Sequence, residues 1–257
     1  MATLDTNIKQ VNADFQAIKN KIVEKGVEVA DGTRTAEYAE KIDAVYDKGK
    51  RAEHDAFWDA YQENGNRRSY ICAFGGSGWT NETFKPKHDI HVTDGYMMFR
   101  NAKITGHLGD ILSARGLSFN TSGIYSSNYM FSSCNFTGLP TMNMSNAEIG
   151  ANMFGSSMIE TIDKIIVNKN TSYHNDAFGN TGGLMYLVIE GEIAKSVNFS
   201  KSVKLIRASI ESIITHLSDT ASDKTLTLSK TAVETAFNTD EWHDIMLTKS
   251  NWTITLV

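Results

Sequence analysis

The chain is 257 residues long, with 41% hydrophobic residues, 21% charged residues and a formal net charge of −5. These fractions are ordinary for a soluble globular protein with one large domain, or with one domain and appendages. The interspersed charges exclude a general nucleic-acid binder, which needs a basic face, and two cysteines are too few for a disulfide-stapled secreted scaffold.

Residues 3–25 form the first predicted element, an amphipathic helix with a narrow apolar stripe. Its apolar residues alternate at spacings of four and three, and they are Leu4, Ile8, Val11, Phe15, Ile18 and Ile22. This spacing is the heptad seam of a coiled coil that joins chains, and isoleucine at both a and d positions favours a trimer. A helix packed on its own domain would show a similar stripe, so that alternative stays open.

The N-terminal residues contain neither the basic region nor the apolar core of a secretory signal peptide. No window of the sequence holds the roughly 18 apolar residues that a membrane-spanning helix needs. We therefore expect a protein that is made in a cytoplasm and does not insert into a membrane.

A turn around Gly26 to Gly32 follows, and then two further helices are predicted, at 35–47 and 50–64. The segment 15–42 resembles a linker common in tail and fibre proteins of phages of Gram-positive bacteria. The matching residues are Ile18, Ile22, Lys25, Gly26, Val27, Val29, Gly32, Thr33, Tyr38, Ala39, Lys41 and Ile42. The resemblance implies that the N-terminal helix anchors the protein to other virion proteins.

Residues 69–95 mix aromatic residues with glycines. We expect Phe74, Trp79, Phe84 and Ile90 to cover one end of the core that the following residues build. This segment is predicted to be an N-terminal cap.

Residues 96–237 contain an internal repeat with a period of about 20 to 25 residues. Phe131 and Phe154 are each followed by apolar residues at offsets of +5, +8, +11 and +13. These residues are Phe136, Leu139, Met142 and Met144 in one copy and Ile159, Ile162, Ile165 and Val167 in the other. Weaker copies begin at Phe99, Phe178 and Phe199. The alternating +11 and +13 positions predict one short strand per copy, with the phenylalanine rings stacked in a buried column.

One copy of the repeat is too short to bury its apolar face alone, whereas stacked copies cover one another. The repeat resembles the BspA-like type of bacterial leucine-rich repeat. The resemblance rests on Met98–Phe99, Met130–Phe131 with Cys134, Met153–Phe154 and Ala177–Phe178. It implies an adhesive or scaffold solenoid. The predicted fold class is α+β, with an N-terminal helical or coiled-coil segment followed by a leucine-rich-repeat β-solenoid with terminal caps.

After the repeat, helices are predicted at 208–218, 230–237 and 241–247, together with strands at TLTLS and TITL. The whole chain is then predicted to have four regions. They are a coiled-coil oligomerisation and anchor helix (1–27), a helical linker (28–68), an N-terminal cap (69–95) and a leucine-rich-repeat solenoid with a C-terminal helical cap (96–257).

No residue pattern points to catalysis, a cofactor or a metal. The pair His88 and His91 has no third ligand nearby, whereas a zinc site needs three or four. Motifs for zinc hydrolysis, a nucleophilic serine and phosphate or dinucleotide binding are absent. We therefore expect a protein that is not an enzyme and that holds no cofactor or metal.

Four tyrosines in or beside the repeats form a candidate ligand face, because tyrosine offers flat contact area at a low entropic cost. They are Tyr125, Tyr129, Tyr173 and Tyr186. The alternative for each is that its ring completes the packing of the domain.

Together these features predict a phage virion protein of the tail or fibre, which forms a homo-oligomer and presents its repeat domain to a cell-surface polysaccharide or protein. The first alternative is a purely structural baseplate or capsid-decoration component without a receptor. The second alternative is a bacterial surface adhesin.

Overall fold

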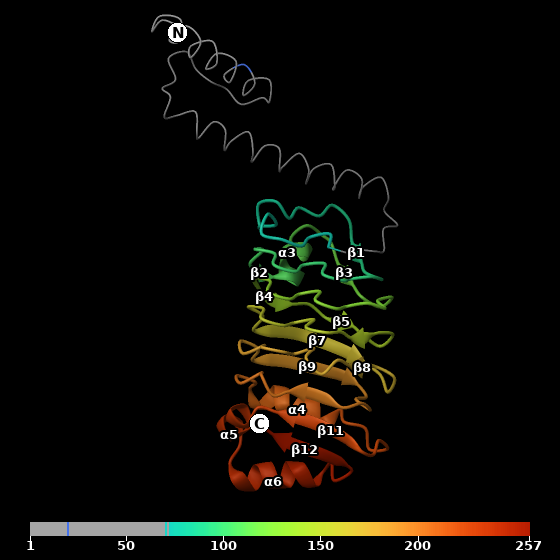
Figure 1. Ribbon diagram of the computed structural model, residues 1–257, viewed down its shortest axis with the longest axis vertical. Coiled ribbons are helices and arrows are strands. Elements are labelled where there is room, and N and C mark those ends of the chain that lie inside the picture. Colours follow the sequence, from blue (N-terminus) through green and yellow to red (C-terminus); the bar gives the residue numbers. More distant parts are fainter. Residues whose placement is uncertain (1–19, 21–69, 71) are drawn as a thin grey trace, which may run out of the picture. The chain divides into compact units, whose positions relative to one another are not determined.

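Figure 1 shows a computed structural model of the chain, which describes residues 20, 70 and 72–257. The chain divides into two compact units, Met1–Ala60 and Tyr61–Val257. The predicted coiled-coil helix with its six seam residues, and the two predicted helices that follow it, lie outside the described residues. Asn20 alone is described there, as an exposed helical residue.

The described residues form twelve strands and four helices. The first strands are β1 (Ile90–His91), β2 (Gly106–His107), β3 (Phe119–Asn120), β4 (Phe136–Leu139), β5 (Met142–Asn143) and β6 (Glu148–Ile149). The others are β7 (Thr161–Val167), β8 (Ser172–Tyr173), β9 (Tyr186–Gly191), β10 (Val197–Phe199), β11 (Lys224–Leu228) and β12 (Trp252–Leu256). The helices are α3 (Leu108–Ser113), α4 (Arg207–Thr215), α5 (Lys230–Ala236) and α6 (Thr239–Leu247).

All strand pairs in the described part of the chain are parallel, and successive strands lie one above another (Figure 1). The largest sheet contains β2, β4, β5, β7 and β9, and it places Gly138 beside Thr161 and Thr161 beside Tyr186. A second sheet holds β10, β11 and β12, while β1 pairs with β3 and β6 with β8. Each pass of the chain, meaning a strand together with the loops that lead to the strand stacked on it, therefore runs in the same direction as the pass beside it.

A column of six phenylalanine rings runs through the core. The rings belong to Phe74, Phe99, Phe131, Phe154, Phe178 and Phe199, and all are buried. Neighbouring ring centroids lie 4.3–6.1 Å apart, close to the range for favourable aromatic pairs. The predicted burial and stacking of Phe131, Phe154 and Phe178 are confirmed. Phe74, predicted only as part of a cap, is the first ring of the column.

Left-handed backbone flanks most of these rings. Two residues before and after Phe154, φ is 46° at Asn152 and 55° at Ser156. The equivalent residues around the three preceding rings are left-handed as well, and they are Cys72, Gly76, Met97, Asn101, Tyr129 and Ser133. The tight bend exposes the backbone of the ring-bearing residue to the next pass, so that the Phe154 N–H donates to the Ala177 carbonyl at 3.1 Å.

The predicted fold class, an α+β leucine-rich-repeat solenoid with terminal caps, is wrong. The described residues form a mixed arrangement of helices and strands. The parallel strands are divided among four sheets, and the four helices are six to nine residues long. No long coiled-coil helix occurs among these residues. The sequence period identifies which rings stack, but strand length and sheet membership depend on backbone hydrogen bonds that an apolar period does not encode.

Helix α4 lies beside the edge of β9 and satisfies the hydrogen-bonding groups there (Figure 1). The Ser209 hydroxyl accepts the Leu187 N–H at 2.9 Å and donates to the Met185 carbonyl at 3.0 Å. One helical turn later, the Ser212 hydroxyl accepts the Ile189 N–H at 2.9 Å. The two serine side chains therefore form the hydrogen bonds with the edge of β9 that the backbone of a neighbouring strand forms elsewhere in the sheet.

Replacing Ser209 with alanine is expected to lower the free energy of unfolding by about 1–3 kcal/mol, because it leaves the buried Leu187 N–H without a partner, while the Met185 carbonyl keeps the Ile206 N–H. Urea unfolding measures this loss, and hydrogen exchange at the Leu187 amide should accelerate. Ser113→Ala, at an exposed serine of α3, is the matched control and should change stability by less than about 0.5 kcal/mol. Equal effects of the two substitutions would contradict this account of the β9 edge.

The predicted elements after the repeat are confirmed to within a few residues, as α4, β11, α5, α6 and β12.

A buried lysine ties the segment after α4 to the end of the chain. Lys249 donates from Nζ to the Leu217 carbonyl and to Asp219, both at 2.6 Å. The Trp252 indole N–H donates to the Ser218 carbonyl at 2.9 Å. These bonds hold β12 and the loop after α4 together.

Candidate functional site

Tyr125 is the most exposed of the four predicted ligand-face tyrosines, at 64%. Its hydroxyl donates to Asp94 Oδ2 at 3.1 Å, and this hydrogen bond raises the pKa of Tyr125 above its ordinary value. The same carboxylate accepts the Tyr96 N–H through Oδ1 at 3.1 Å. The ring of Tyr125 is thus held in one place while its face stays open to solvent.

Tyr129 is half-buried and has a left-handed φ of 57°. Its ring meets the Tyr96 ring edge-on at 6.5 Å, and the Arg100 guanidinium lies 5.4 Å from its centroid. A cation so placed is attracted to the ring. Much of Tyr129 is therefore already used in contacts within the protein.

Tyr173 and Tyr186 have opposite surroundings. The Tyr173 hydroxyl is buried with no hydrogen-bond partner among the described residues, and burial raises the pKa of this group. Tyr186 begins β9 and is 39% exposed. Of these two, Tyr186 is therefore the more exposed, and the hydroxyl of Tyr173 is hidden from solvent.

The four predicted tyrosines belong to two different regions of the domain. Tyr125, Tyr129 and Tyr173 come from chain passes that adjoin one another. The Tyr129 N–H donates to the Ala151 carbonyl at 2.9 Å, and Tyr173 pairs with Ile149 in the same pass as Ala151. Tyr186 instead lies in the largest sheet, beside Thr161. The structure therefore brings Tyr125, Tyr129 and Tyr173 near the β6–β8 pair, whereas Tyr186 lies in a different sheet, beside β7.

A histidine–aspartate contact lies on the largest sheet. His107 Nε2 is 3.2 Å from Asp163 Oδ1, and His107 Nδ1 accepts the Gly109 N–H at 3.1 Å, which caps α3. A Cβ on Gly138 would lie 2.2 Å from His107 Cδ2, so this glycine makes room for the ring. Since both ring nitrogens have partners within the protein, we interpret His107 as a link between α3 and β7 and not as a catalytic base.

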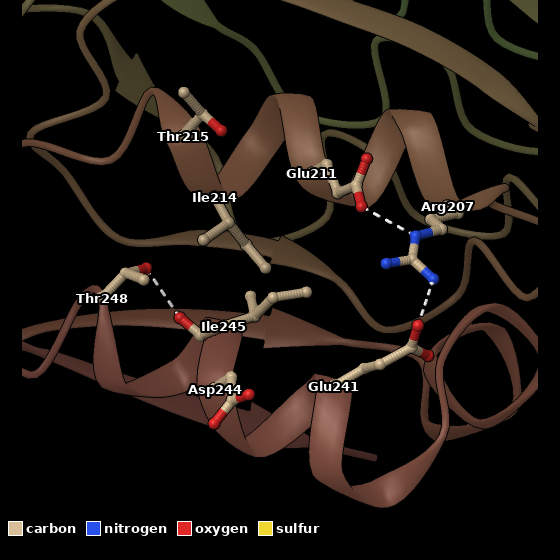
Figure 2. A pocket seen from close by; sticks show the side chains of 8 residues that line it. All are labelled: Arg207, Glu211, Ile214, Thr215, Glu241, Asp244, Ile245 and Thr248. Atoms are coloured by element: carbon tan, nitrogen blue, oxygen red, sulfur yellow. Dashed lines mark hydrogen bonds and ion pairs between the residues drawn. The ribbon is translucent and has the colours of Figure 1, made fainter.

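A cavity of about 380 Å³ separates α4 from α6 (Figure 2). It is lined by Arg207, Glu211, Ile214 and Thr215 of α4, by Glu241, Asp244 and Ile245 of α6 and by Thr248 just after it. Ile214 and Ile245 point toward one another across the gap (Figure 2). No residue of α6 is fully buried, so the cavity leaves this helix only partly covered.

Arg207 closes one end of the cavity. Its Nε donates to Glu211 at 2.8 Å, and its Nη1 donates to Glu241 at 2.9 Å (Figure 2). The bonds to Glu241 and Glu211 raise the pKa of Arg207, and the bond from Arg207 lowers the pKa of Glu241. Glu241 also accepts the Asn238 N–H, which completes a capping box at the start of α6. The sequence predicted neither this ion-pair set nor the cavity, because no local motif links residues on two different helices.

Across residues 72–257, no three His, Cys, Asp or Glu side chains gather where they could hold a metal ion. None of the described helices is both long and apolar enough to span a bilayer. Comparisons with family models, curated proteins and solved structures find no match to this chain.

The two cysteines are expected to differ sharply in reactivity. Cys72 is exposed, whereas Cys134 is buried and burial raises its pKa to about 12. The thiolate is the reactive form, so about one thiol per folded chain should react quickly with an aromatic disulfide reagent at pH 8. Cys72→Ser should abolish the fast reaction, and Cys134→Ser should leave it unchanged. Fast reaction of both thiols in the native protein would contradict the burial of Cys134.

Proposed function

We propose that this chain is a virion structural and adhesion protein, associated with a phage tail or fibre and without enzymatic activity. In this proposal the N-terminal segment anchors the protein to other virion proteins and forms a homo-oligomer. The domain at 70–257 presents a surface to a host-cell polysaccharide or protein. The resemblance of residues 15–42 to phage tail and fibre linkers supports the anchor.

The observation that carries the adhesive part is that two tyrosines, in separate regions of the domain, are exposed. Tyr125 and Tyr186 keep open rings on passes that are fixed by ring stacking and by strand pairing. A rigid aromatic side chain loses little entropy when it binds, which suits it to a recognition surface. Several weak sites on one particle would then act together, as multivalent attachment requires.

Binding of the fluorescently labelled full chain to Gram-positive host cells tests the adhesive part. Tyr125→Ala and Tyr186→Ala should each weaken the binding. Tyr173→Phe is the matched control, because it removes only a buried hydroxyl and should leave binding unchanged. The proposed surface would be contradicted if neither tyrosine-to-alanine variant weakened binding, or if only the Tyr173→Phe control did.

Immunogold labelling of intact particles tests the location. Label at a fibre tip would support attachment to the host. Label confined to a baseplate or a head, together with no binding to cells, would favour the structural alternative. That alternative is supported by surface side chains that bond within the domain, such as Asn146 Nδ2 to the Ser122 carbonyl and Asn168 Nδ2 to the Ser145 carbonyl.

The proposed homo-oligomer is tested by sedimentation of the full chain. A trimer is the expected result because isoleucine recurs at both seam positions of the N-terminal heptads. Ile8→Asp places a charge in the predicted seam and should dissociate the assembly. Gln10→Asp adds the same charge outside the seam and should leave the assembly intact. A monomer at high concentration of the unchanged chain would contradict the coiled coil.

A further inference from the structure

We propose that the cavity between α4 and α6 is a binding site for an uncharged ligand that joins a short aliphatic group to a carbonyl oxygen, as a peptide segment does. This goes beyond the proposed adhesion, because Tyr125 and Tyr186 do not line the cavity. Its size is within the range of small-ligand sites, which begins at about 300 Å³.

The middle of the cavity would take the aliphatic group. Ile214 and Ile245 face one another there (Figure 2), and the half-buried Ile245 supplies the accessible apolar surface, since Ile214 is only 3% exposed. Covering that surface removes it from water, which is favourable in proportion to its area. A sugar, whose surface is mostly hydroxyl groups, would gain less from this contact.

The Arg207 end would take the carbonyl oxygen. The guanidinium uses Nε and Nη1 for Glu211 and Glu241, and Nη2 makes no hydrogen bond among the described residues. Nη2 points toward the space between the two isoleucines (Figure 2). It therefore offers N–H donors beside the apolar surface, where an acceptor on an aliphatic ligand can reach them.

The charges around the cavity favour a neutral acceptor. One guanidinium faces three carboxylates, those of Glu211, Glu241 and Asp244, so the lining carries an excess of negative charge. An anionic ligand would be repelled by this excess. A cationic ligand whose carbonyl oxygen accepted from Nη2 would bring its positive charge beside the Arg207 guanidinium, and this repulsion opposes binding in that pose.

The test uses the full chain labelled with ¹³C at isoleucine methyl groups and titrated with N-acetyl-leucinamide, a neutral probe. The Ile214 and Ile245 methyl signals should shift saturably, with a dissociation constant on the order of 1 mM for so small a ligand. N-acetyl-leucine, an anion, and leucinamide, a cation, should both bind more weakly. No saturable shift at these two methyls, or tighter binding of either charged probe, would overturn the proposal.

Two variants and a matched control locate the site. Ile245→Ser should weaken binding of the neutral probe about tenfold by removing apolar contact. Arg207→Lys keeps the charge but loses the planar donor, and should weaken binding about fivefold. Leu247→Ser changes a 62% exposed residue of α6 that does not line the cavity, and should bind like the unchanged protein. Circular dichroism confirms that each variant is folded, and unchanged binding in a folded Ile245→Ser would overturn the proposal.

Discussion

Replacing Phe154 with alanine is expected to lower the free energy of unfolding by about 3–5 kcal/mol, as for other large buried aromatic residues. Its ring is buried between those of Phe131, at 6.1 Å, and Phe178, at 5.1 Å. Alanine would remove both ring contacts and leave a cavity in the middle of the column. Because the neighbouring rings are held by their own backbone bonds, they cannot move together to fill it.

Urea or thermal unfolding of the purified full chain measures this effect. Tyr186→Ala provides the control, because it removes a similar ring from the exposed start of β9 and should cost about 1 kcal/mol or less. A loss below about 1 kcal/mol for Phe154→Ala would show that the column contributes little to stability.

Replacing Gly191 with alanine is expected to cost about 3–5 kcal/mol, the sum of backbone strain and a steric clash. Gly191 ends β9 with a φ of +99°, a conformation that side chains disfavour. A Cβ there would lie 2.0 Å from the Val167 carbonyl oxygen, which is part of the backbone of β7. The clash can be relieved only by moving β9 away from β7, which pairs with it.

Gly106→Ala is the matched control for Gly191→Ala. Gly106 has a φ of +95°, but a Cβ there would meet nothing within 4 Å. The Gly106→Ala variant should therefore lose only the free energy of unfolding that corresponds to backbone strain, about 1–3 kcal/mol. The difference between the two losses measures the clash against Val167, and two equal losses would mean that β7 and β9 separate at little cost.

Much of the core could be predicted from the sequence, since burial follows from apolar residues at repeated offsets. Phe131, Phe154 and Phe178 stack as their spacing indicated, and the helices and strands after the repeat lie near their predicted positions. The fold class could not be predicted in this way. It depends on details such as α4, where two serines replace a strand at the edge of β9, and serine carries no periodic signal.

The surface was harder to predict than the core. Tyrosine in a polar loop can bind a ligand or complete the packing, and the sequence does not separate these outcomes. The structure distinguishes the two outcomes, since Tyr125 is exposed and the hydroxyl of Tyr173 is buried.

The contact of His107 with Asp163 joins residues 56 positions apart, and the Arg207–Glu241 pair joins two helices. Such contacts exist only once the chain passes are stacked.

The left-handed residues beside the phenylalanine rings restrict how this chain can vary over evolution. Asparagine, glycine and other small polar residues tolerate the left-handed backbone conformation of Asn152 and Ser156. A β-branched residue would disfavour this conformation, on which the bonds to the next pass depend. Accepted changes at these sites should therefore be drawn from a narrow set of residue types. Surface positions between the rings are free of this restriction, so new contact surfaces can arise there without disturbing the interior.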